Sequence, residues 1–110
     1  MGHEVQDQVS LELARRVAAG LPKHPEWVEL ARANLDRWSR QNQDATALLR
    51  CYAEWRQFLS RPAEEIAAIL TADTSEAQRL RQNSPFAGVL SPQEVWEIKS
   101  CLRRHATSAA

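Results

Sequence analysis

Residues 25–41 of the chain read PEWVELARANLDRWSRQ, and their spacing points to the fold class. The apolar side chains recur three and four residues apart, which is typical of one face of an α-helix. Pro25 suits the first turn of such a helix, and Glu26 follows where the helix dipole favours negative charge. The sequence predicts a helix over residues 25–41 that turns this face to a core. The positions on the face are Trp27, Leu30, Ala31, Asn34, Leu35 and Trp38.

The same spacing continues on both sides of this stretch and predicts further long helices over residues 4–20, 45–59 and 92–105. A pair of short helices is expected between the helices over residues 45–59 and 92–105. No strand-like alternation and no tight hairpin dipeptide is present. The prediction is all-α: a single compact bundle of five or six helices, with short turns and one apolar loop before the last helix. This domain covers residues 1–105, and a frayed C-terminal tail covers residues 106–110.

Three helix starts carry capping signals. Ser91 precedes a proline at the first helical position and a glutamate at the third, which is the strongest local pattern in the chain. Asp73 and Glu76 stand at capping-box spacing. Asp44 is expected to cap the helix over residues 45–59.

Composition limits the classes of function. The 110 residues make one ordinary domain, and the 14 basic and 14 acidic side chains cancel. A neutral total argues against coating nucleic acid or lying on an anionic membrane. No signal-peptide pattern and no apolar run long enough to span a bilayer is present. The expected location is therefore the cytoplasm.

No motif for catalysis, metal binding or cofactor binding is present. Cys101 and His105 share a helix face, but no third group is visible that would orient them as a nucleophile and a base. Glu64 and Glu65 are adjacent, so they diverge on a helix and cannot converge as an acid–base pair. The three histidines are scattered and show no metal-ligand spacing. The protein is therefore expected not to be an enzyme, and both Cys101 and Cys51 are expected to be reduced.

Residues 83–90, NSPFAGVL, form an unusually apolar loop. Exposed apolar side chains at Phe86, Val89 and Leu90 would need a partner, and Trp96 follows at the start of the last helix. The leading hypothesis is a non-enzymatic module that binds another protein, or a second copy of itself, through these four residues. The competing explanation is that the loop folds back and plugs the bundle.

Four tryptophans are many for a chain of this size. Trp27 and Trp38 lie eleven residues apart, or three helical turns, and so share a face. Together with Trp55 and Trp96 they either line an apolar pocket or fill the core between helices. Their positions within the apolar stripes favour the core.

Residues 65–81 resemble a bacterial helix-turn-helix. In that motif a small residue lies inside the first helix, where the second helix crosses it closely, and apolar residues flank it. The second helix then carries apolar positions three residues apart. The matching positions are Ile66, Ala67, Leu70, Ala77 and Leu80.

The resemblance implies the alternative hypothesis, a DNA-binding or antitoxin-like transcriptional regulator that would normally act as a dimer. Three features depart from the motif. Thr71 stands where glycine is usual, Ala77 stands where valine or isoleucine is usual, and Asp73 with Glu76 places negative charge near the phosphates. By the resemblance, the groove-facing and phosphate-facing residues would be Thr74, Ser75, Gln78, Arg79 and Arg81.

A second basic group, Arg103 and Arg104, ends the last helix, where cations also suit the helix dipole. If the loop brought these residues beside Arg79 and Arg81, they would form a modest patch for an anionic ligand. The sequence leaves open whether the four side chains meet.

Overall fold

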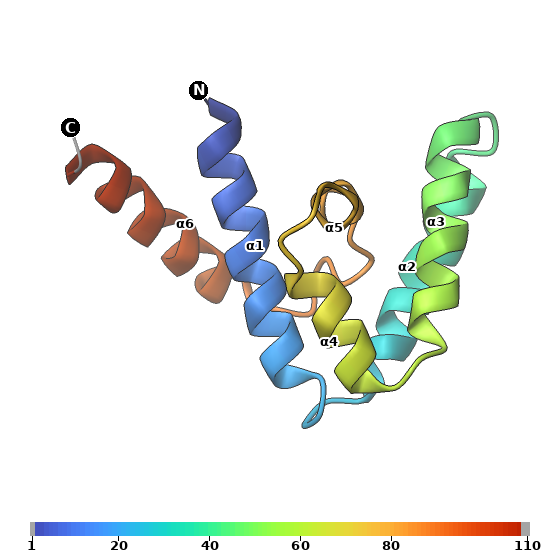
Figure 1. The fold of residues 1–110 in the computed structure, drawn as a ribbon. Coiled ribbons are helices and arrows are strands. Elements are labelled where there is room, and N and C mark those ends of the chain that lie inside the picture. The colour runs from blue at the N-terminus through green and yellow to red at the C-terminus, as the bar shows by residue number, and fades with distance from the viewer. Residues whose placement is uncertain (1, 109–110) are drawn as a thin grey trace.

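The computed structural model contains six α-helices and no strand within residues 2–108 (Figure 1). It describes the backbone of residues 2–108 and the side chains of residues 7–104. The predicted all-α bundle of five or six helices is therefore confirmed. The elements are α1 (Gly2–Gly20), α2 (Glu26–Gln41), α3 (Thr46–Leu59), α4 (Ala63–Thr71), α5 (Ser75–Arg81) and α6 (Pro92–Ser108).

The predicted boundaries agree closely with these helices. α6 continues to Ser108, and the rest of the predicted tail, Ala109 and Ala110, lies outside the described residues. None of the described helices is both long and apolar enough to cross a membrane.

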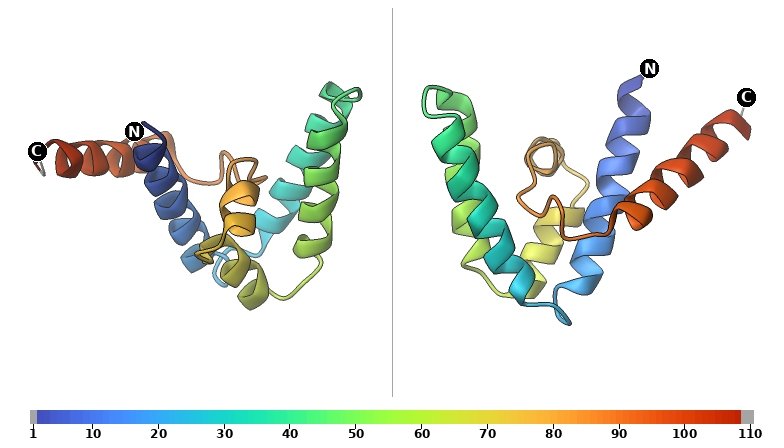
Figure 2. Two further views of the ribbon diagram at one scale, coloured as in Figure 1. Left: turned by 45° about the horizontal axis from the view of Figure 1, so that its top comes forward. Right: turned by 180° about the vertical axis from the view of Figure 1, so that it is seen from behind.

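The helices form an open V rather than a closed barrel of parallel rods (Figures 1 and 2). α1 packs against α4 and α6 in one arm, whereas α2 and α3 form an antiparallel hairpin in the other. α4 lies at the base, and the short α5 lies between the two arms. α6 occupies the outer edge of the first arm, where it packs against α1.

Trp55 of α3 lies at the centre of the core and is 0% exposed. Its indole Nε1 donates a hydrogen bond to the carbonyl of Leu80 at 3.0 Å, which ties α3 to α5. Phe58 and Phe86 present their rings edge-on to it, with centroids 6.2 and 6.3 Å away. The other large, fully buried side chains are Leu21, Leu35, Ile66, Leu70 and Pro85. The core thus joins all elements from α1 to the loop before α6.

The predicted inner face of α2 needs one correction. Ala31 and Leu35 are fully buried, but Leu30 is 50% exposed, so its prediction as a core residue was wrong. The buried face of α2 is centred between Ala31 and Leu35, and at 100° per residue Leu30 lies far round the helix from that centre. Trp27 and Trp38 are partly buried against the core.

The capping predictions are partly confirmed. The Ser91 hydroxyl accepts a hydrogen bond from the Glu94 amide at 3.1 Å, as predicted. The predicted cap at Asp73 was wrong, because Thr74 caps α5 by accepting from the Ala77 amide at 3.1 Å. The cap at Asp44 was also wrong, since α3 begins after Ala45 and has no side-chain cap.

Candidate interaction surface

The loop before α6 lies against the core. Phe86 is only 3% exposed, and Val89 and Leu90 are partly buried against the same cluster. The Asn34 side chain of α2 donates to the carbonyls of Pro85 and Ala87, at 2.8 and 3.1 Å. Two hydrogen bonds from one amide therefore hold the loop across the bundle, which is the arrangement expected of a plug. Nothing in the sequence pattern around Asn34 pointed to this contact.

Trp96 has the opposite environment. It is 67% exposed, the largest exposed fraction of any large hydrophobic side chain among the described residues. Ile98, two residues later, is buried, and Val95 and Leu102 are partly buried. α6 therefore turns its apolar stripe to α1 and holds the Trp96 ring out on the other side. Of the four residues predicted to form a protein-binding surface, Trp96 is the one that is accessible and Phe86 is not.

The outward side of α6 continues past Trp96. Residues three, four, seven and eight positions apart lie on the same side of a helix. Glu97, Arg103 and Arg104 are exposed, and Ser100 between them is partly exposed. We call this set, Trp96, Glu97, Ser100, Arg103 and Arg104, the Trp96 face.

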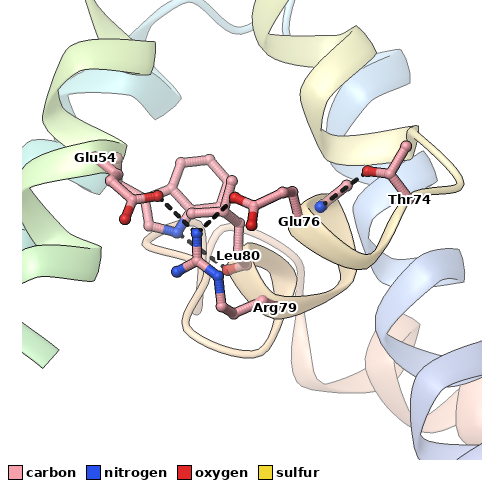
Figure 3. Close-up of polar contacts among 7 residues, drawn as sticks. Glu54, Thr74, Glu76, Arg79 and Leu80 are labelled. Atoms are coloured by element: carbon pink, nitrogen blue, oxygen red, sulfur yellow. Dashed lines mark hydrogen bonds and ion pairs between the residues drawn. The ribbon is translucent and has the colours of Figure 1, made fainter. Parts of the chain in front are cut away.

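The segment that resembles a helix-turn-helix does form two short helices, α4 and α5, joined by a three-residue turn. Figure 3 shows how the polar side chains of α5 are used. The Arg79 guanidinium contacts Glu54 of α3 at 2.8 Å and Glu76 at 2.9 Å. These hydrogen bonds raise the pKa of Arg79 further above its usual value. The positive charge that the resemblance assigns to a phosphate contact is matched here by two carboxylates.

Arg81 is also engaged within the chain. Its Nη1 donates to the carbonyls of Leu70 and Ala72, at 3.1 and 2.8 Å. These contacts satisfy carbonyls at the end of α4, where a helix leaves its last acceptors unpaired. Its Nε is buried without a hydrogen-bond partner. Arg81 therefore stabilises the turn between α4 and α5.

The other residues that the resemblance singles out lie on α5 or at its start. Thr74 is the helix cap, Ser75 is exposed, and Gln78 is partly buried. α5 itself lies inside the V, between α1 and the α2–α3 hairpin (Figures 1 and 2). In the helix-turn-helix, the second helix lies in the major groove. The two arms here rise on either side of α5.

The side chains considered for catalysis do not come together. Cys51 is buried and forms no disulfide, and burial raises the pKa of its thiol, which disfavours the reactive thiolate. Glu64 and Glu65 are both exposed in the first turn of α4. The side chain of His105 lies outside the described residues, so the pair with Cys101 is not defined. Among the described side chains, no three of His, Cys, Asp and Glu gather to hold a metal ion.

Shallow hollows flank the loop after α5 on both sides. One, of about 220 Å³, lies between α1 and residues 81–87, and the other, of about 340 Å³, lies against the α2–α3 hairpin. Trp38 borders the second hollow, whereas Trp55 fills the core and Trp27 stacks on His24. The tryptophans therefore do not converge on a shared pocket.

Over residues 2–108 the geometry defines an all-α globule of six helices, with an accessible aromatic face on α6. No protein-family model, curated protein or solved structure matches the chain.

Proposed function

We propose that the protein is a non-enzymatic helical interaction module that binds a protein chain through the Trp96 face. The observation that carries the proposal is the 67% exposure of Trp96 on an ordered helix. Tryptophan is among the residues that most often dominate binding energy at protein interfaces. Covering its ring removes a large apolar surface from water while its indole N–H can still donate a hydrogen bond.

The setting of Trp96 also supports a binding role. α6 is held against α1 by Ile98 and its neighbours, so the ring projects from a supported helix rather than from a loop. Less conformational entropy is then lost when a partner covers the ring. Polar and charged side chains surround it, as they do at the rim of many protein interfaces.

The proposal is tested by photo-crosslinking from Lys99, which is exposed one turn after Trp96. A photoreactive amino acid at Lys99 is expected to capture a defined protein partner in the source cells. The matched control carries the same group at Ala53, an exposed position on α3 in the other arm. The product should be absent from the control and should be lost when Trp96→Ala is added to the Lys99 variant. Identical products from both positions, or a product that survives Trp96→Ala, would argue against the Trp96 face.

The helix-turn-helix alternative has less geometric support, because Arg79 and Arg81 already bind groups of their own chain and α5 lies between two arms. We expect no binding of mixed-sequence duplex DNA in a fluorescence-anisotropy titration at about 50 mM salt, where phosphate-driven binding is strong. Micromolar binding that collapses at about 200 mM salt and is abolished by Arg79→Ala would instead favour the DNA-binding regulator. Trp96→Ala serves as the control that should leave such binding unchanged.

A further inference from the structure

We infer that the partner of the Trp96 face is a second copy of this chain, with the two α6 helices packed antiparallel. The inference rests on the proposed function, because it names the partner of that same surface. The order of charges along α6 and the positions of Trp96 and Ser100 within it favour this partner.

α6 is divided by charge along its length. Its beginning carries Glu94 and Glu97, and Lys99, Arg103 and Arg104 follow from its middle toward its end. An antiparallel neighbour places the first half of one helix beside the second half of the other. Two copies of α6 in this orientation are therefore complementary in charge, whereas two parallel copies would align like charges.

The spacing of the exposed residues sharpens this complementarity. Trp96 and Arg103 are seven residues apart, or two helical turns, so they lie on one line along α6. Glu97 and Arg104 are also seven apart and lie on the adjacent line. Both pairs are centred close to Ser100. A single antiparallel crossing near Ser100 therefore brings Trp96 opposite Arg103 of the other copy and Glu97 opposite Arg104.

Each of these contacts has favourable chemistry. A guanidinium over the face of a tryptophan ring is attracted by its π-electrons, and an arginine pairs with a carboxylate through charge-assisted hydrogen bonds. Arg103 and Arg104 also take part in interactions within their own chain. Because a guanidinium has five N–H donors, such an interaction leaves donors for a second partner.

Ser100 suits the crossing point. Its short side chain lets two helix backbones approach, as a long side chain at this position would not. In a two-fold pair every contact forms twice, so the Trp96–Arg103 and Glu97–Arg104 contacts each count double. The contact also closes on itself and stops at two copies.

The position of α6 leaves room for this pairing. Its opposite side, with Ile98 at the centre, packs on α1 and needs no further cover. α6 lies on the outer edge of the V, away from the α2–α3 arm (Figure 2). Glu97 and Arg104 also border a hollow against Glu12 and Arg16 of α1, so a second molecule would lie beside α1 and away from the α2–α3 arm.

Charge reversal provides the test, measured by sedimentation velocity from about 1 to 200 µM, the range over which small interfaces associate. The unmodified chain is expected to form a concentration-dependent dimer. Trp96→Ala, Glu97→Arg and Arg104→Glu should each weaken the dimer by about tenfold or more. Arg40→Glu changes an exposed residue of α2 and is the matched control. It should leave the dimer unchanged.

The decisive sample is an equimolar mixture of the Glu97→Arg and Arg104→Glu chains. In a dimer of either variant alone, the side chains at positions 97 and 104 of the two copies carry like charges and face each other at two places. In the mixed pair, each of these two places joins a positive and a negative side chain. We expect the mixture to restore the dimer to within about threefold of the unmodified chain, with circular dichroism showing that each variant is folded. A mixture that stays monomeric, or charge reversals without effect on a wild-type dimer, would overturn the antiparallel arrangement.

The dimer and the binding role of the Trp96 face can be disproved separately. A folded wild-type chain that stays monomeric up to about 200 µM would overturn self-association. If crosslinking from Lys99 then captures a different protein, the proposed function stands and its partner is heterologous. If crosslinking captures nothing, the proposed function fails as well.

Discussion

Trp55→Ala is expected to lower the free energy of unfolding by about 3–5 kcal/mol, the usual range for removing a fully buried aromatic side chain. Trp55 is 0% exposed and contacts Phe58 and Phe86 through ring edges. The substitution leaves a cavity where three segments meet, and it also leaves the Leu80 carbonyl without its donor. Because small domains are stable by only about 5–15 kcal/mol, this loss is a large share of the total stability. Urea unfolding followed by circular dichroism measures the loss.

Two further variants separate the causes of this loss. Trp55→Phe retains most of the apolar volume but removes the indole donor, so it should cost less than the alanine variant and more than about 1 kcal/mol. Trp96→Ala removes the same side chain from an exposed position and should change stability by about 0.5 kcal/mol or less. Equal losses for Trp55→Ala and Trp96→Ala would contradict the assignment of one tryptophan to the core and the other to the surface.

Phe86→Ala is expected to destabilise the fold by about 3 kcal/mol, because Phe86 is 3% exposed and its ring packs edge-on against Trp55. For a domain of this size, about 1 kcal/mol shifts the melting temperature by roughly 4–8 °C. The melting temperature of the Phe86→Ala chain should therefore fall by about 12–24 °C. The folded fraction should still form the contact made by the Trp96 face. Thermal melts and sedimentation of the same sample measure both properties together.

This prediction distinguishes the two explanations of the apolar loop. A plug loses stability when Phe86 is removed, whereas a binding loop loses its partner at unchanged stability. Gln82→Ala, at an exposed position shortly before the loop, controls for substitution in this segment and should be nearly neutral. If the Phe86→Ala chain had normal stability but no longer bound its partner, the loop rather than the Trp96 face would be the interface.

Local sequence signals predicted most of the secondary structure. The apolar spacing that defines a helix acts over three and four residues, so α2 and α3 could be recognised without knowledge of their neighbours. The start of α6 was equally clear, because Ser91, Pro92 and Glu94 all favour a helix that begins there. The caps at Asp44 and Asp73 were missed by one residue. At α5 the neighbouring Thr74 caps with similar energy and backbone dihedrals choose between the two residues, whereas α3 begins after Ala45 without a side-chain cap.

The candidate site was less accessible to such reasoning. Phe86 lies in the loop and Trp96 shortly after it, and the same binding role was predicted for both aromatic residues. The structure separates them, since Phe86 turns inward to Trp55 while Trp96 lies opposite the stripe that packs on α1. Arg79 likewise looked available for a phosphate until the fold placed Glu54 beside it, from a helix 25 residues earlier.

The sequence by itself determined the all-α class, a count of five or six helical segments and the residues that share each helix face. Those properties depend on hydrogen bonds and side-chain spacing within one or two turns of the chain. The tertiary structure alone decided which faces are covered, because burial depends on elements that are distant in sequence. Asn34 holding the loop and Leu30 remaining exposed both follow from how α2 lies against the rest of the chain. The same long-range packing leaves Trp96 outside the core, and the proposed function rests on that exposure.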